Sequence, residues 1–300
     1  MTGQRRKPAQ ESFGLVLSGG GARGLAHIGV LKAFEDMGMV PSLIVGVSMG
    51  ALVGIVFGLR PDWYALLSSL DFSAELGGGQ TSLSSGSGLM GRIGFWISAP
   101  RRFLNFFSGW GLSGLEQSRA LSFLTDLTQG KQLESSRVKI TTAATDLLTG
   151  RRIVFRKGDA ARAIYASAAL AGIFQPLNEN GLCLADGAYT DLAPIDLARR
   201  GNIPVIAVDV TQMESVESVT NGFQAITRAM DICHNQHAHL RFAEADLVLR
   251  PRFTRIIDTL DFTSTSECVR AGYAIVKENK VAIASVLRLR GKNKKSVRRY

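Results

Sequence analysis

The chain has 300 residues, of which 46% are hydrophobic and 20% charged, a composition that suits one large α/β domain with a sizeable core. The three cysteines, Cys183, Cys233 and Cys268, lie far apart and show no C-x-x-C spacing. They argue against a disulfide framework and indicate a reduced compartment. No internal repeat is visible.

The net charge of +10 lies at the two ends of the chain. Residues 1–12 form a basic N-terminal extension, and residues 288–300 form a basic C-terminal tail with seven lysines and arginines and no acidic residue. The body, residues 13–287, is close to neutral, which argues against a specific nucleic-acid groove in the fold. The tail is suited to anionic lipid or RNA, and a solvated, disordered tail is the alternative.

The sequence shows no secretory signal, because Arg5-Arg6-Lys7 precedes polar residues rather than an apolar segment. The uncharged residues 37–59 are long enough to span a bilayer. Pro41 and the Gly46-Val47-Ser48-Met49-Gly50 turn interrupt them, so a buried strand and a buried helix explain this apolarity better. We expect a cytoplasmic protein, with peripheral contact at the inner face of the membrane as a further hypothesis.

Residues 13–18 predict a first strand, followed by the loop Gly19-Gly20-Gly21-Ala22-Arg23-Gly24 and a helix over residues 25–37. Such a loop forms a nest of backbone amides that can hold an anion. Gly19, Gly21 and Gly24 also fit a dinucleotide fingerprint, but the second strand lacks the acidic residue that would bind the ribose. The loop also lacks the Gly-Lys-Ser/Thr of a P-loop, so an oxyanion is the anion that fits better.

Residues 43–53 predict a strand, a sharp turn and a helix. Their centre, Gly46-Val47-Ser48-Met49-Gly50, fits the G-x-S-x-G pattern of a nucleophile elbow. A serine on this strained turn projects its hydroxyl away from the backbone, while Gly46 and Gly50 let strand and helix approach closely. The N-terminus of the helix favours negative charge that develops beside the serine. Ser48 is therefore the candidate nucleophile.

Residues 76–111 differ in character from the rest of the chain. A glycine- and serine-rich stretch is followed by aromatic residues mixed with arginines. We interpret this segment as a flexible, lid-like insertion, for which contact with a lipid interface and ordinary packing are equal alternatives. Its aromatic residues include Phe95, Trp96, Phe103, Phe106, Phe107 and Trp110.

Strands and helices alternate through the remaining chain, which predicts a mostly parallel sheet covered on both faces. Helices are expected over residues 62–70, 114–127, 160–171, 222–243 and 267–289, and strands over residues 138–145, 151–155, 182–185, 204–210 and 246–249.

Ser48 needs a base, and the four histidines, His27, His234, His237 and His239, all fall within predicted helices. None follows a strand directly, where α/β hydrolases carry their histidine. Asp186 does, because it ends a strand and precedes Gly187. A serine–aspartate pair is chemically possible if the carboxylate is close and partly desolvated, since desolvation raises its proton affinity. An ordinary Asp-Gly turn is the alternative.

Three segments, the glycine loop at residues 19–24, the elbow at residues 46–50 and Asp186-Gly187-Ala188, resemble the motifs of the patatin-like phospholipase family in order and spacing. The bacterial branch related to neuropathy target esterase is the most similar. The resemblance covers roughly residues 13–287. It implies an α/β fold, a three-layer α/β/α sandwich with a mostly parallel central sheet, and neither cofactor nor metal.

The resemblance also implies the roles of individual residues. Ser48 would be the nucleophile and Asp186 the proton acceptor of a dyad without histidine. The amides of Gly20, Gly21 and Ala22 would form the oxyanion hole.

Two local departures from the family pattern bear on loop geometry rather than on the dyad. Residues 191–194 read Asp-Leu-Ala-Pro where the family has Asn-Asn-x-Pro, and Ala188 replaces a third glycine. Arg23 would either brace the glycine loop, which we favour, or attract a phosphate head group.

The expected function is therefore that of a serine acyl hydrolase acting on fatty acyl esters of phospholipids, lysophospholipids or related lipids through an acyl-enzyme intermediate. A thioesterase or transacylase fits the same residues. A non-enzymatic lipid- or protein-binding regulator is the alternative from another class. A zinc site at His234, His237 and His239 is a weaker alternative, because histidines on the surface of a helix are common. The sequence leaves the oligomeric state open.

Overall fold

The computed structural model describes residues 12–71, 117–211, 213, 215, 218–220, 222–259 and 261–296. The expectations for residues 1–11, for the aromatic insertion at residues 76–111 and for the last four residues lie outside this range.

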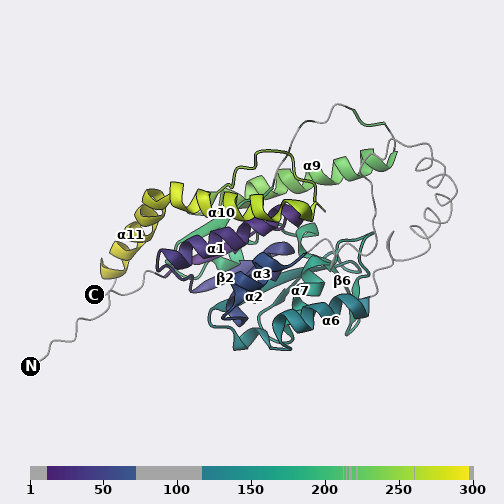
Figure 1. Ribbon diagram of the computed structural model, residues 1–300, viewed down its shortest axis with the longest axis horizontal. Coiled ribbons are helices and arrows are strands. Elements are labelled where there is room, and N and C mark those ends of the chain that lie inside the picture. The colour runs from purple at the N-terminus through teal and green to yellow at the C-terminus, as the bar shows by residue number, and fades with distance from the viewer. Residues whose placement is uncertain are drawn as a thin grey trace, which may run out of the picture.

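One eight-stranded sheet runs through the described part of the chain (Figure 1). Its order is β5-β6-β3-β2-β1-β7-β8, and β4 pairs separately with β3. The strands are β1 (Gly14–Leu17), β2 (Leu43–Gly46), β3 (Lys139–Asp146), β4 (Arg152–Phe155), β5 (Leu177–Glu179), β6 (Leu182–Asp186), β7 (Val205–Val208) and β8 (Leu247–Leu249).

The sheet is parallel from β8 through β7, β1 and β2 to β3, and antiparallel where β4, β5 and β6 join. The prediction of a mostly parallel sheet is confirmed for five of the eight strands, from β3 to the edge strand β8. The antiparallel pairing also sets the position of Asp186. Because β6 runs opposite to β3, its last residue, Asp186, pairs with Ala144.

Helices cover both faces of the sheet, as the predicted three layers require. They are α1 (Ala26–Asp36), α2 (Met49–Leu59), α3 (Trp63–Ser69), α6 (Gln117–Thr128), α7 (Ala160–Ala168), α8 (Ile195–Ala198), α9 (Gly222–Phe242), α10 (Thr265–Glu278) and α11 (Lys280–Ser296). Because side chains of a strand alternate in direction, Leu15 and Leu17 of β1 face the core with α1 and α2, whereas Val16 faces α8 and α9.

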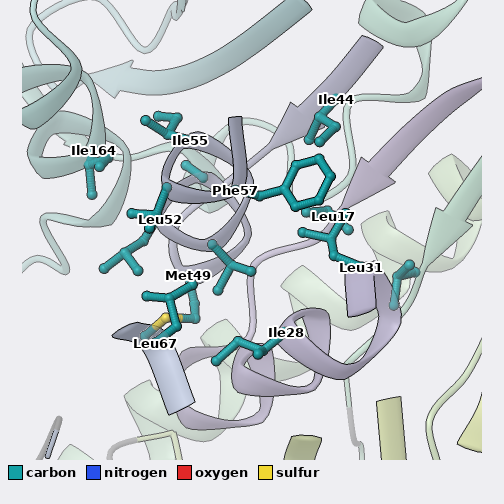
Figure 2. Close-up of a cluster of buried hydrophobic side chains, with 14 of the residues drawn as sticks. Leu17, Ile28, Leu31, Ile44, Met49, Leu52, Ile55, Phe57, Leu67 and Ile164 are labelled. Carbon is teal, nitrogen blue, oxygen red and sulfur yellow. The ribbon is translucent and has the colours of Figure 1, made fainter. Parts of the chain in front are cut away.

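The larger core lies between the sheet and α1, α2 and α7 (Figure 2). Every residue of α2 is buried, so this helix is apolar all round. Figure 2 shows Phe57 of α2 near Ile44 and Leu17 of the strands, whereas Leu52 points to the side of Ile164. The buried strand and helix inferred for residues 37–59 are therefore confirmed.

The C-terminal part of the chain differs from the single helix predicted over residues 267–289. Two helices, α10 and α11, meet at Asn279, and α11 leaves α10 at an angle (Figure 1). The Asn279 side-chain amide donates a hydrogen bond to the Ile275 carbonyl over 2.8 Å, which competes with helix continuation. The backbone of α11 continues through Ser296, so most of the predicted basic tail is helical. No described helix is long and apolar enough to cross a membrane.

Candidate active site

Ser48 lies at the end of β2, immediately before α2, as the elbow pattern predicts. Its backbone φ is 54° and ψ is −123°, a conformation that L-residues rarely adopt. The strain places the side chain at the N-terminus of an eleven-residue helix, whose dipole favours developing negative charge.

The two glycines of the elbow are required by close packing. A Cβ on Gly46 would overlap the Gly50 carbonyl, and a Cβ on Gly50 would overlap the Leu17 carbonyl of the neighbouring strand. The sharp turn therefore forms only where both positions lack a side chain.

The glycine loop lies beside the nucleophile. A Cβ placed on Gly19 would lie 3.5 Å from the Ser48 Cβ and 3.6 Å from the Ala188 Cβ. The Gly19 amide donates a hydrogen bond to the Leu192 carbonyl over 3.2 Å. The fold therefore brings together all three motif segments, which are separated in sequence.

The three amides assigned to the oxyanion hole are not equivalent. The amides of Gly20 and Gly21 have no acceptor among the described residues, whereas the Ala22 amide donates to the Thr259 carbonyl over 2.8 Å. The proton of the Ala22 amide is thus already engaged, which weighs against the expectation that this amide binds an oxyanion. Gly20 and Gly21 remain candidates.

The segment after β8 covers the outside of the glycine loop. Besides the Thr259 contact, the Arg23 guanidinium donates to the Ile257 carbonyl over 3.1 Å. This contact supports the interpretation that Arg23 braces the loop. Sequence reasoning missed the covering segment, because nothing in residues 251–259 indicates which loop they contact.

Asp186 ends β6 and is 3% exposed. One carboxylate oxygen accepts the Ala188 amide over 2.8 Å, which fixes the orientation of the side chain. Burial raises the pKa of Asp186 to about 6, although hydrogen bonds from the Ser48 side chain and the Ala188 amide oppose this shift. A carboxylate with such a pKa is a better proton acceptor near neutral pH than an exposed one.

The described contacts of the histidines are with groups other than Ser48. His27 is fully buried, its Nε2 lies 2.9 Å from the Ser18 carbonyl oxygen, and burial lowers its pKa to about 4. His234 lies against the Tyr189 ring, with ring centroids 5.6 Å apart, and His237 and His239 are exposed. Within the described residues no group of three or more histidine, cysteine or acidic side chains is arranged to hold a metal.

The departure at residue 191 has a structural explanation. Asp191 is 4% exposed, and its carboxylate forms ion pairs with the guanidinium groups of Arg152, over 2.8 Å, and Arg241, over 3.0 Å. Both arginines also contact Asp196. The negative charge at the position where the family has asparagine is thus paired with one arginine of β4 and one of α9. These ion pairs tie the loop after Asp186 to both elements.

Comparison with known proteins gives the family. The model of the family described as patatin-like phospholipase matches residues 15–199, more than half of the chain and all three motif segments. The chain belongs to the patatin-like phospholipase family. The patatin-like fold expected from the sequence is therefore confirmed.

Curated relatives of this patatin-like protein include fungal proteins named Lysophospholipase NTE1. The protein of Cryptococcus neoformans var. neoformans serotype D is 33% identical over 210 residues, which cover 70% of this chain and 12% of the relative. That of Yarrowia lipolytica is 30% identical over 213 residues, covering 71% and 14%. The chain thus matches only about an eighth of the length of these relatives, and the expected relation to neuropathy target esterase is confirmed at this level.

Solved structures similar to this patatin-like protein include VipD from Legionella pneumophila, with a TM-score of 0.47 and 16% identity over 89% of this chain and 66% of VipD. Human GIVD cytosolic phospholipase A2 gives a TM-score of 0.45 and 12% identity, covering 93% of this chain and 60% of the human chain.

Proposed function

We propose that this protein is a serine acyl hydrolase that cleaves fatty acyl esters of lysophospholipids, phospholipids or related lipids. One observation carries the proposal: the strained Ser48 lies beside a buried carboxylate, Asp186, whose pKa is raised to about 6. A nucleophile and a base with this proton affinity are the two parts that acyl transfer needs. The lipid class is supported by the family and by relatives named as lysophospholipases.

In the first half of the reaction, the Ser48 hydroxyl attacks the acyl carbonyl and its proton moves to the Asp186 carboxylate. The carbonyl oxygen becomes an oxyanion that accepts hydrogen bonds from the amides of Gly20 and Gly21. Each such donor is worth about 3–4 kcal/mol in enzymes where it has been removed. The carbon–oxygen bond to the leaving alcohol then breaks, and Asp186 returns the proton to that alcohol.

In the second half, water attacks the acyl-Ser48 ester while Asp186 accepts a proton from the water. The same amides hold the second oxyanion. The bond to Ser48 breaks, Asp186 returns the proton to the Ser48 oxygen, and the fatty acid leaves. One carboxylate thus serves as base and acid in turn, which requires a pKa near the working pH.

The experiment that tests the proposal is product analysis with the purified full chain. Lysophosphatidylcholine, diacyl phosphatidylcholine and an acyl-CoA are each incubated with the protein and with Ser48→Ala, and products are identified by mass spectrometry. The proposal predicts free fatty acid from at least one of the two lipids with the wild type only. Transfer of the acyl group to a second lipid would indicate a transacylase, and hydrolysis of acyl-CoA alone a thioesterase. No turnover of any substrate would favour the non-enzymatic regulator and contradict the proposal.

A further inference from the structure

The C-terminal end of α7 contacts the backbone of both proposed dyad residues. The Ser48 amide donates a hydrogen bond to the Ser167 hydroxyl oxygen over 3.0 Å. The Asp186 amide donates to the Ala169 carbonyl over 3.0 Å. Ser167 and Ala169 are two residues apart, so one short segment accepts hydrogen bonds from the backbone amides of both residues.

The bond to Ser167 satisfies an amide that the elbow leaves without a local backbone acceptor. Val47 donates to the Leu17 carbonyl, and Gly50 and Ala51 donate within the turn, but the Ser48 amide finds its acceptor 119 residues away. A buried amide without an acceptor is destabilising, because it has lost its hydrogen bonds to water. At Ser48 that cost would fall on a backbone already held at a φ of 54°.

A second hydroxyl orients Ser167. The Thr142 Oγ1 donates to the Ser167 Oγ over 3.0 Å, and both side chains are fully buried. Thr142 lies on β3 in register with Gly46, the first residue of the elbow. Most residues of α7 around Ser167 are alanines, so this pair of hydroxyls is a polar contact within an apolar layer. Thr142, Ser167 and the Ser48 amide form one hydrogen-bonded chain.

We propose that Ser167 is a positioning residue that holds the backbone of the nucleophile, with Thr142 fixing its hydroxyl. The inference rests on the proposed acyl-transfer function and extends it to residues that do not touch the substrate. Without the Ser167 hydroxyl the elbow loses its acceptor, and the Ser48 side chain shifts relative to Asp186, which stays bound to Ala169. Because misplacement of reacting groups by about 1 Å can cost about 100-fold in rate, this loss should appear in kcat.

The chain offers a matched control on the same strand. Thr141 is the neighbour of Thr142 on β3, is equally buried, and its hydroxyl has no hydrogen-bond partner among the described residues. Thr141→Val and Thr142→Val therefore make the same chemical change one position apart, but only Thr142→Val breaks the chain to Ser48. Thr142→Ser keeps the hydroxyl and is the conservative rescue.

The experiment measures kcat, KM and the rate of Ser48 labelling by a fluorophosphonate for the full-length wild type and for Ser167→Ala, Thr142→Val, Thr142→Ser and Thr141→Val. We expect Ser167→Ala to lower kcat and the labelling rate by about 10- to 100-fold with KM changed less than about threefold. Thr142→Val should lose activity in the same direction, whereas Thr142→Ser and Thr141→Val should stay within about threefold of the wild type. Equal losses in Thr141→Val and Thr142→Val, or an unchanged Ser167→Ala, would overturn the inference.

A second measurement does not depend on catalysis. Hydrogen–deuterium exchange of the peptide that contains Ser48 should accelerate in Ser167→Ala and Thr142→Val, and should not in Thr141→Val. If exchange accelerates in these two variants but the wild type neither hydrolyses esters nor reacts with the probe, the proposed function is contradicted and the contact is not. Unchanged exchange in both variants would contradict the positioning role. If Ser167→Ala does not fold, Thr142→Val and Thr142→Ser decide the matter alone.

Discussion

The amide of Ala22 donates a hydrogen bond to the carbonyl of Thr259 over 2.8 Å, and this contact fixes the glycine loop from its outer side. It leaves two amides of the loop, those of Gly20 and Gly21, without an acceptor among the described residues. The loop lies beside Ser48 through Gly19, while Ala22 is held by a segment more than 200 residues further along the chain.

The glycine loop should be sensitive to added side chains in two different ways. Gly21→Ala places a Cβ against the Thr259 carbonyl at a φ of 55°, so it should lower the melting temperature as well as activity. Gly19→Ala meets only ordinary contacts, the nearest at 3.5 Å, but it projects toward Ser48 and Ala188. It should keep the fold and lose most esterase activity.

Thermal unfolding and ester hydrolysis measured on the same preparations check this prediction. Gly222→Ala is the control, because a Cβ there meets nothing within 4 Å. Full activity in Gly19→Ala would mean that the substrate carbonyl does not bind between Ser48 and Ala188.

The rate should depend on pH through Asp186. The base must be ionised to accept the Ser48 proton, so kcat/KM should rise with pH and level off above an apparent pKa of about 6. A pH profile from 4.5 to 8 on a soluble ester tests this. A flat profile over that range would show that no group with this pKa limits the free enzyme.

Stability should respond to the same group with a definite sign. Because the folded pKa of Asp186 is raised from 3.8 to about 6, the folded state binds more protons than the unfolded state between these values, and stability falls as the pH rises through them. Asp186→Asn removes this loss. It should abolish turnover and raise the melting temperature relative to the wild type more at pH 8 than at pH 4.5. An equal difference at both pH values would contradict the buried, titrating carboxylate.

Of the four histidine substitutions, only that of His27 should have a large effect, and the effect should be on stability. His234→Gln, His237→Gln and His239→Gln should keep turnover, because Asp186 and not a histidine is the proposed base. The folded pKa of His27 is lowered from 6.5 to about 4, so the unfolded state binds more protons in that window and stability declines as the pH falls. His27→Gln should lower the melting temperature at pH 7 and weaken its decline toward pH 5. If any one of the four substitutions were as damaging to turnover as Asp186→Asn, the enzyme would use a histidine and the dyad would be wrong.

The C-terminal end of the chain should bind anionic membranes. Residues 288–300 hold seven basic residues, and each lysine or arginine near such a surface contributes about 1 kcal/mol. Co-sedimentation with vesicles should increase with phosphatidylserine content and weaken with salt. It should also fall when residues 288–300 are deleted, or when Lys292, Lys294 and Lys295 are all replaced by Glu in the full-length chain. Deletion of residues 1–11 is the control for the other basic end. Binding that survives both C-terminal changes would show that this end is not the anchor.

Local sequence patterns predicted the central strands, the elbow and the three motif segments, because each depends on neighbours in sequence. Gly46, Ser48 and Gly50 define a turn by themselves, and the buried α2 follows from its unbroken apolarity. The division at Asn279 escaped prediction because apolar periodicity continues through Ile275, Ile283 and beyond. The three-residue strand β5 is too short for a periodic signal.

The parts of the site that the sequence could not give depend on contacts between distant segments. Ser167 lies in an alanine-rich helix and looks like a neutral core position until α7 packs against the elbow. The engagement of the Ala22 amide depends in the same way on Thr259. Motifs indicate which residues react, whereas tertiary packing decides which of their backbone groups stay open.

The central claim is that Ser48 is the acylated nucleophile of a serine–aspartate dyad. The most direct measurement is labelling of the wild type and of Ser48→Ala with a fluorophosphonate, followed by peptide mass spectrometry to locate the adduct. We predict one adduct, on Ser48, none in Ser48→Ala, loss of ester hydrolysis in that variant, and an unchanged melting temperature within a few degrees. An adduct on another residue of the wild type, or full hydrolysis by Ser48→Ala, would contradict the claim.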